Sequence, residues 1–280
     1  MNKETIVTQY SGDNVPFSEQ RLRRSLERSG ANKEMIEEVI VEIENELYDG
    51  ITTKEIYRTA FKILKSKARY VAARYKLKNA IMELGPSGYP FEQYVGEILK
   101  FQGYNVQVGV IVEGFCVNHE VDVLAENDEH QYIVECKFHN RHGYYCDVKV
   151  PLYIHSRFRD IEKKFKSEPA YQKKSHHGWI ITNTRFSPDA IQFANCAGLK
   201  LVGWDYPKRG SLKEWIDVSG LHPVTSLTTL TKSEKRKVLD RKVVLCKDLH
   251  QSPFLLDEIG IRPPQKQRVL DECRGLCGVI

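Results

Sequence analysis

Apolar residues recur at helical spacing through the first third of the chain. After a short β-prone stretch, Ser18 is placed to cap a helix that Gly30 can close. Residues 52–55 read Thr-Thr-Lys-Glu, the pattern of a capping box, and two further helical patterns follow them. We therefore expect a compact, mostly helical domain over residues 1–85.

A cluster of helix breakers at residues 84–90 marks the boundary to a second domain. Pro90 suits the first position of a helix that carries a single apolar stripe and that Gly103 can end. Strand patterns dominate the next forty residues. They occupy residues 105–113, 116–125 and 131–139.

Helix and strand patterns then alternate up to residue 204. A basic helical stretch at residues 153–166 precedes a buried-type strand at 178–183. Ser187 opens another helix, and a last strand follows at 200–204. This order predicts an α/β fold over residues 86–210, with a mixed sheet flanked by helices.

The pattern is less regular over residues 211–280. Residues 231–234 can cap a short helix, and residues 265–276 are compatible with a longer one. We expect a small helical C-terminal region that packs on the α/β domain.

Composition narrows the class of protein without fixing its function. With 41% hydrophobic and 28% charged residues, the chain has the make-up of a globular protein. Its apolar runs are far shorter than the ~18 residues of a membrane span, and its polar start lacks the apolar core of a signal peptide, so we expect a cytoplasmic protein without membrane contact. The net charge of +5 permits a polyanionic partner. Seven cysteines without a Cys-x-x-Cys pair favour reduced thiols over a disulfide frame.

The second and third strand patterns form a predicted hairpin that carries two acidic residues. If residues 127–130 are its loop, Glu126 faces Gln131, and the same register places Asp122 opposite Glu135. A slip by two residues keeps both carboxylates on one face of the sheet, whereas a slip by one separates them.

Two carboxylates so placed, with Lys137 beside them, indicate a metal site. Like charges directly opposite each other destabilise a strand pair, so a cation between them is expected. Mg²⁺ or Mn²⁺ suits such oxygen ligands, and Lys137 could orient an attacking water or stabilise charge on a phosphate. The chemistry predicted is metal-assisted phosphodiester hydrolysis. The alternative is that Asp122, Glu135 and Lys137 are solvated charges on an exposed sheet face.

Basic residues with interleaved aromatic rings follow the hairpin and could contact a phosphate backbone. Their alternative is a solvated helix face, because acidic residues dilute the charge. His119 and His139 flank the acidic pair, but histidines in such positions are more often surface residues. The candidate nucleic-acid-binding residues are Arg157, Arg159, Lys163, Lys173 and Lys174.

Asp122, followed after a turn by Glu135-Cys-Lys137, resembles the Asp…Glu-x-Lys signature of restriction-endonuclease-like nucleases, especially their Mrr-like branch. The resemblance covers about residues 88–207. It implies an Mg²⁺-dependent DNA endonuclease with Asp122 and Glu135 as metal ligands and Lys137 as the catalytic lysine. Glu92 would be a further catalytic residue, the acidic side chain that the helix places beside the metal site. Many Mrr-like proteins have Gln where this chain has Glu135. Cutting both strands of a duplex is simplest with two equivalent sites, so the analogy also suggests a homodimer.

The N-terminal domain resembles an ATP-cone, a nucleotide-sensing module. The matching features are Gly12, the segment 16–18, the segment 49–56 and the late helix around residues 73–77. The resemblance implies ATP as a regulator, although the chain has Gln9-Tyr10 where the family usually has a Lys-Arg pair.

Two other functions remain open from the sequence. The nuclease-like domain could bind nucleic acid and regulate without cutting it. The same metal chemistry could also act on RNA or branched DNA, because it does not select the polymer.

Overall fold

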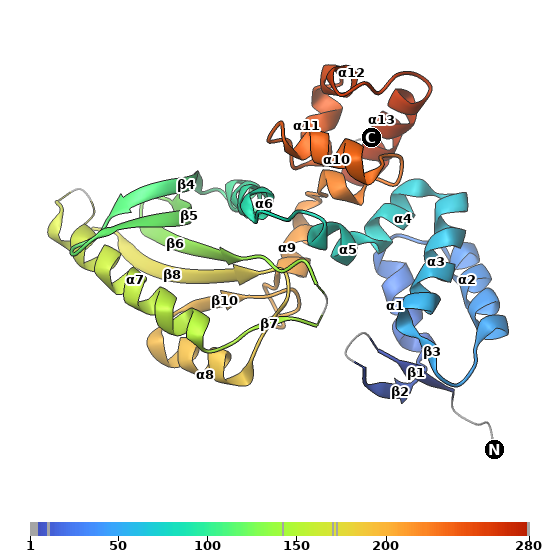
Figure 1. Cartoon of the computed structure of the whole chain (residues 1–280), viewed down its shortest axis with the longest axis horizontal. Helices are drawn as coiled ribbons and strands as arrows, with labels where there is room; N and C mark the ends of the chain where they lie inside the picture. Colours follow the sequence, from blue (N-terminus) through green and yellow to red (C-terminus); the bar gives the residue numbers. More distant parts are fainter. Residues whose placement is uncertain (1–4, 10–11, 142, 170, 172, 279–280) are drawn as a thin grey trace. The chain divides into compact units, whose positions relative to one another are not determined.

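The computed structural model describes residues 5–9, 12–141, 143–169, 171 and 173–278 (Figure 1). The chain divides into two compact units. The helical unit joins residues up to Ile81 with residues from His222 onward, and the sheet unit spans Met82–Leu221. No helix among the described residues combines the length and apolar character needed to cross a bilayer.

The N-terminal part of the helical unit is a three-stranded sheet with helices beside it. Strand β1 pairs with β2 on one side and with β3 on the other. Thr52 and Glu55 form the predicted capping box at the start of α3, and Ser18 caps α1 as predicted. The elements are β1 (Ile6–Thr8), β2 (Asn14–Pro16), α1 (Glu19–Arg28), α2 (Lys33–Glu46), β3 (Ile51–Thr52), α3 (Thr53–Lys67), α4 (Arg69–Tyr75) and α5 (Leu77–Met82).

The C-terminal part of this unit packs against those helices. Ala73 of α4 shares an apolar cluster with Val224, Leu249 and Leu276, and the Thr225 hydroxyl donates a hydrogen bond to the carbonyl of Ala80 at 2.7 Å. The tail was expected to pack on the α/β domain. This is wrong for residues 222–278, because their apolar side chains complete the core of the N-terminal helices instead. The elements are the 3-10 helix η1 (Val224–Ser226), α10 (Lys232–Leu239), α11 (Cys246–Gln251), α12 (Phe254–Glu258) and α13 (Gln265–Cys277).

The sheet unit is built on five strands in the order β10-β8-β6-β5-β4. β4, β5 and β6 are antiparallel neighbours, whereas β6, β8 and β10 run parallel, so the sheet is mixed as predicted. The elements are α6 (Tyr89–Phe101), β4 (Asn105–Glu113), β5 (Asn118–Glu126), β6 (His130–Lys137), β7 (Tyr145–Cys146), α7 (Lys149–Ser167), β8 (Ser175–Thr182), β9 (Arg185–Phe186), α8 (Pro188–Ala197), β10 (Lys200–Val202) and α9 (Leu212–Ser219).

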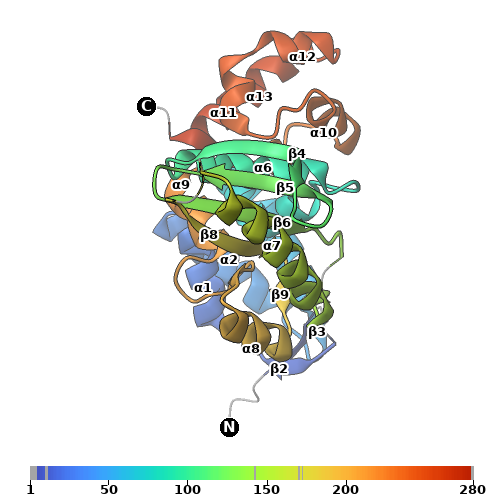
Figure 2. The ribbon, with the colours of Figure 1, turned by 90° about the vertical axis from the view of Figure 1, so that its left-hand side faces the viewer.

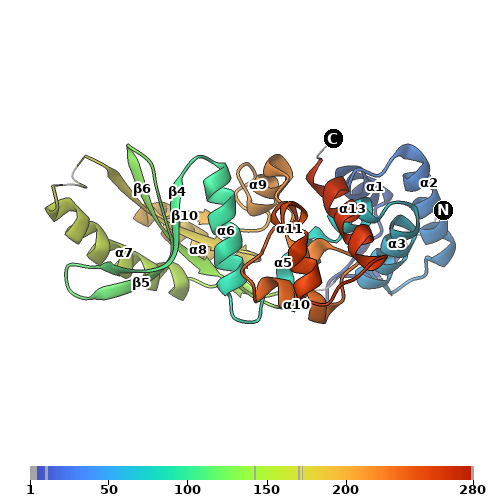
Figure 3. The same ribbon diagram turned by 90° about the horizontal axis from the view of Figure 1, so that it is seen from above.

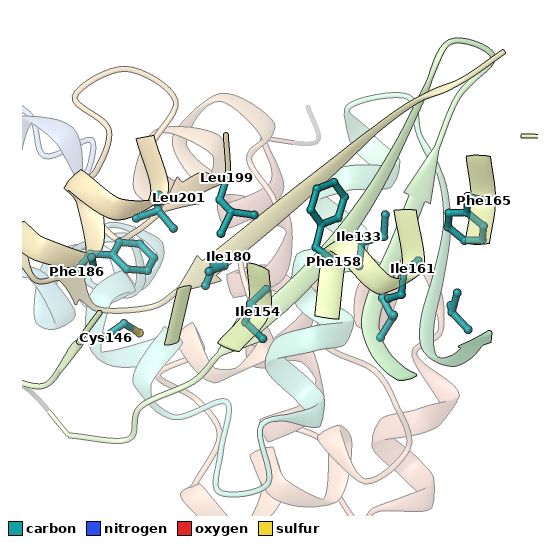
Figure 4. Close-up of a cluster of buried hydrophobic side chains, with 14 residues drawn as sticks. Ile133, Cys146, Ile154, Phe158, Ile161, Phe165, Ile180, Phe186, Leu199 and Leu201 are labelled. Carbon is teal, nitrogen blue, oxygen red and sulfur yellow. The ribbon is translucent and has the colours of Figure 1, made fainter. Parts of the chain in front are cut away.

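Helices cover both faces of this sheet. Figure 1 shows α7 and α8 below the strands, Figure 2 shows α7 in front of them and α6 behind, and Figure 3 shows α6 beside β4. On the α7 face, Phe158 and Ile161 pack on Ile133 and Ile180 in one apolar cluster (Figure 4). The connection from β6 to β8 through α7 therefore fixes α7 across the strands that carry the predicted acidic residues.

Candidate active site

Along the β4–β5 pair, the apolar side chains point first to one face of the sheet and then to the other. Asp122 lies at this change. Val106 and Val108 lie against Gly96 of α6, whereas Val110 packs in the cluster under α7. Gly109, between them, has a φ of +65°, a left-handed conformation that glycine adopts without strain. The ladder pairs Val108 with Val123 and Val110 with Val121, so Asp122 lies opposite this glycine.

The Asp122 carboxylate turns toward β6. The β5–β6 ladder has the predicted register, with Glu126 paired to Gln131, and its last pair is Val123 with Val134. Beyond that pair, Oδ2 of Asp122 accepts a hydrogen bond from the backbone N–H of Cys136 at 2.7 Å. The side chain thus replaces a rung of the ladder and is fixed beside Glu135.

Glu135 is buried and paired with two cationic side chains. Its side chain is 10% exposed. Lys137 Nζ lies 2.5 Å from its Oε1, and Arg157 Nη1 of α7 lies 2.7 Å from its Oε2. Glu135 and Lys137 therefore share the sheet face that α7 covers.

Glu92 completes a group of mutually repelling acids. Burial, together with the nearby Asp122, Glu120 and Glu135 carboxylates, raises the pKa of Glu92 to about 7. Burial and the charge of Glu135 raise the pKa of Asp122 to about 6, against the lowering effect of the Cys136 hydrogen bond. The structure thus brings together all four predicted catalytic residues, and the field of their carboxylates favours a bound cation.

A cavity of about 310 Å³ opens beside two of these four residues, Asp122 and Glu135, whereas Glu92 and Lys137 do not line it. Asp122 and Glu135 form part of its wall, and α7 contributes Tyr153 and Arg157, which are one helical turn apart. Its lining is Asn118, His119, Glu120, Asp122, Glu135, Tyr153 and Arg157. The space is polar and large enough for several waters or a phosphate group.

The donor set suits a small, hard cation. Within the part of the chain that the structure describes, no three His, Cys, Asp or Glu side chains form a ready metal cluster. Two carboxylates, with waters and substrate oxygens as the other ligands, are the arrangement in which proteins commonly bind Mg²⁺. Asp122 and Glu135 can therefore hold the cation that the signature implies, and the repulsion between the acids agrees with such a ligand.

A second polar group braces the tip of the β4–β5 hairpin. Asp160 of α7 accepts hydrogen bonds from the backbone N–H of Cys116 at 2.9 Å and pairs with His119 Nε2 at 2.8 Å. The hydrogen bond from His119 is the main cause that lowers the pKa of Asp160 to about 2. His119 thus lines the cavity and is oriented by α7, a place that its strand-end position in the sequence did not indicate.

Gly114 makes this brace fit, and its replacement tests the packing. A Cβ at Gly114 would lie 2.8 Å from Cδ2 of His119 and would collide with Asp160. We expect Gly114→Ala to cost about 1–3 kcal/mol of the free energy of unfolding, measured by denaturant melts, because the backbone must move. The matched comparison is Asp160→Asn, which keeps the volume of the side chain that the new Cβ would meet. Equal free energies of unfolding for Gly114→Ala and wild type would contradict the close packing of Gly114 against His119 and Asp160.

The other predicted nucleic-acid-binding residues lie apart from the acidic group. Arg159 pairs with Glu162 at 2.6 Å, and Lys174 pairs with Glu126 at 3.0 Å. Lys163 lies over the ring of Phe115 at the hairpin tip, with its Nζ 3.5 Å from the ring centre, and Lys173 is exposed. Of the five basic residues, the structure brings Arg157 into the cavity.

His139 has a local structural role. Its Nδ1 lies 3.0 Å from the Thr184 hydroxyl, and its backbone exchanges hydrogen bonds with the Asn183 side chain. Sequence reasoning missed the contact of Arg157 with Glu135, the place of Tyr153 and the pairing of His119 with Asp160. The spacing of Tyr153, Arg157 and Asp160 at i, i+4 and i+7 on one helix face was the available signal.

Comparison with known proteins agrees with this architecture. The model of the restriction endonuclease (Mrr catalytic) family matches residues 85–207, and that of the ATP cone domain matches residues 5–80. The class is therefore that of restriction-endonuclease-like proteins with an N-terminal ATP cone, as predicted, and the expected fold class is confirmed. A third family model, described as AF1548-like, C-terminal, matches residues 222–277.

A relative and a solved structure define the family more narrowly. An uncharacterized protein of Archaeoglobus fulgidus is 34% identical over 185 residues, which are 66% of this chain and 100% of that protein. The crystal structure of a protein of unknown function, AF1548, is 34% identical, with a TM-score of 0.56 over 68% of this chain and 98% of that one. The chain belongs to the family of these AF1548-like proteins, in which it carries a restriction-endonuclease-like domain.

Proposed function

We propose that this protein is an Mg²⁺- or Mn²⁺-dependent endonuclease that hydrolyses phosphodiester bonds of DNA. The observation that carries the proposal is the convergence of Asp122 and Glu135 on one polar cavity, with Lys137 in contact with Glu135. The restriction-endonuclease-like family supports the same reaction. A cytoplasmic location belongs to the proposal because the substrate is DNA.

Each residue has a role in the proposed reaction. Asp122 and Glu135 would hold the cation, which when bound acts as a Lewis acid and lowers the pKa of water. The Cys136 N–H fixes Oδ2 of Asp122, so the carboxylate is oriented before a ligand arrives. Lys137, which contacts Glu135, would orient the attacking water or stabilise charge on the phosphate. Glu92, with its raised pKa, can hold or release a proton near neutral pH.

The proposal extends to partners and regulation. The basic residues of α7 and of the segment after it would contact the DNA backbone, and a homodimer would place two sites on one duplex. ATP would act through the cone domain, to which the family model assigns residues 5–80. Gln9 stands where the family usually has a phosphate-binding lysine, and Tyr10, its neighbour in that comparison, lies outside the described residues.

A cleavage assay on the purified full chain tests the proposal. Plasmid, phage DNA, single-stranded DNA, branched DNA and RNA are each incubated with Mg²⁺, Mn²⁺ or a chelator, with and without ATP. We expect nicking or cutting of duplex DNA only when a cation is present. Light scattering of the same samples gives the oligomeric state. Cleavage that persists in the chelator would contradict the metal-dependent mechanism.

One observation favours a second function, that of a non-cleaving nucleic-acid-binding regulator. Both oxygens of Glu135 are engaged by the cationic side chains of Lys137 and Arg157, so the acidic group is partly neutralised without a metal. Salt-sensitive DNA binding without uptake of Mg²⁺ or Mn²⁺ in calorimetry would favour this function. Cutting of RNA or branched DNA in preference to duplex DNA would instead reassign the substrate.

A further inference from the structure

Arg157 joins three parts of the cavity wall. Its Nη1 lies 2.7 Å from Oε2 of Glu135 on β6, and its Nη2 donates a hydrogen bond to the backbone carbonyl of Glu120 on β5. The guanidinium also lies over the ring of Tyr153, 5.6 Å from its centre. One arginine of α7 therefore contacts both strands of the hairpin that carries the proposed metal ligands.

The position of Arg157 is that of an anion-binding group. Its side chain is 16% exposed and lines the same cavity as Asp122 and Glu135. A guanidinium has five N–H donors in a planar fork that matches two oxygens of a phosphate, and stacking on an aromatic ring holds that plane. The Tyr153 ring and the Glu120 carbonyl thus orient the Arg157 guanidinium. Its partner in this structure is the Glu135 carboxylate, an anion that presents two oxygens to a guanidinium as a phosphate does.

The two contacts of Glu135 compete with the role proposed for it. A carboxylate that turns its oxygens toward a cation loses part of its attraction for a guanidinium, because the cation neutralises its charge. Lys137 is two positions from Glu135 on the same strand and stays near its carboxylate, whereas Arg157 reaches it from α7. The Arg157 Nη1 donor is then the group set free, and it faces the cavity that substrate must enter.

We propose that Arg157 binds the scissile phosphate of the nucleic acid. Until the metal site is filled, the Glu135 carboxylate pairs with the Arg157 guanidinium in place of that phosphate. The proposal rests on the function proposed above. It makes Arg157 an internal stand-in for the cation in the metal-free protein and a substrate-binding residue in the metal-bound protein. Binding of the cation and binding of the phosphate then strengthen each other, and this coupling is reciprocal.

Binding measurements without cleavage test this assignment. Fluorescence anisotropy with labelled duplex DNA, with and without Ca²⁺, measures DNA affinity, since Ca²⁺ is also a hard cation with oxygen ligands. Calorimetry with Mn²⁺ alone measures the metal site in the absence of DNA. The variants are Arg157→Ala and Arg157→Lys, and the matched control is Arg209→Ala, which removes an exposed arginine in the loop after β10.

In wild type and Arg209→Ala, Ca²⁺ should tighten DNA binding. In Arg157→Ala we expect that gain to disappear, with DNA affinity in Ca²⁺ about tenfold to a hundredfold weaker, as for a lost charge-assisted contact. Mn²⁺ should bind Arg157→Ala at least as tightly as wild type, because the competitor for Glu135 is gone. Arg157→Lys should keep part of the DNA affinity but lose the bidentate contact.

Two results would overturn the assignment. Unchanged Ca²⁺-dependent DNA binding in both variants would exclude Arg157 as the phosphate contact, and weaker Mn²⁺ binding in both would show that it only positions Glu135. Thermal melts show whether each variant is folded. If Arg157→Ala does not fold, the measurements on Arg157→Lys decide the test. If wild type itself takes up no Mn²⁺ and cuts no substrate, the proposed function fails, which is a different outcome.

Discussion

Asp122→Asn and Lys137→Met should both abolish cleavage, but only the first should abolish metal binding. Asparagine removes the negative charge, while its amide oxygen can still accept the hydrogen bond from the Cys136 N–H. Methionine removes the ammonium group beside Glu135 and leaves both proposed ligands in place. Loss of a group that stabilises charge in the transition state typically lowers kcat by ~10²–10³-fold, and we expect at least that loss in each variant.

Plasmid cleavage in Mg²⁺ and calorimetry with Mn²⁺ separate the two effects. Lys100→Ala, which removes an exposed lysine from the end of α6, is the control for the loss of one positive charge. It should cut like wild type. Wild-type cleavage by Lys137→Met would remove this lysine from the mechanism, and full Mn²⁺ uptake by Asp122→Asn would show that the cation binds elsewhere.

The affinity for Mn²⁺ should rise steeply between about pH 5 and about pH 7. Burial is the main cause that raises the pKa of Asp122 to about 6 and that of Glu92 to about 7. A carboxyl group must lose its proton before it binds a cation, so a raised pKa moves the onset of metal binding to higher pH. The gain over this range is about tenfold if only Asp122 must ionise, and on the order of several hundredfold if Glu92 must ionise too.

Calorimetry across this pH range, repeated with Glu92→Gln, measures the effect and the part that Glu92 plays in it. The glutamine variant should retain the Asp122 part of the rise and lose the steeper part. A Mn²⁺ affinity that is constant from about pH 5 to about pH 7 would contradict the ligand assignment, because neither acid would then release a proton on binding.

Local sequence signals were enough to predict most of the sheet unit. The pattern predicts a strand over residues 105–113, which form β4, and Ser187 caps the start of α8 as predicted. The hairpin register from Glu126 with Gln131 to Val123 with Val134 followed from alternation and loop length alone. Each of these features depends on residues that are close together in the sequence or that are joined by a single hairpin turn.

The unpredicted contacts depend on packing between distant segments. Arg157 meets Glu135 because apolar residues of α7 place that helix across β6, a contact between residues 22 positions apart. His119 meets Asp160 for the same reason. The packing partner of the C-terminal tail also depends on which apolar surfaces are complementary. The sequence of an amphipathic helix shows that one face is buried but not against which surface.

The chain crosses from the helical unit into the sheet unit near residue 82 and returns near residue 221. Both segments that flank the sheet unit belong to one core, which the tail and Ala73 share. A single proteolytic nick at either crossing would therefore leave the two fragments associated, and two nicks are needed to release the central fragment. A shortened protein that ends at residue 221 would lack α13, which packs on α4, so removal of the tail damages the first domain of the sequence rather than the second.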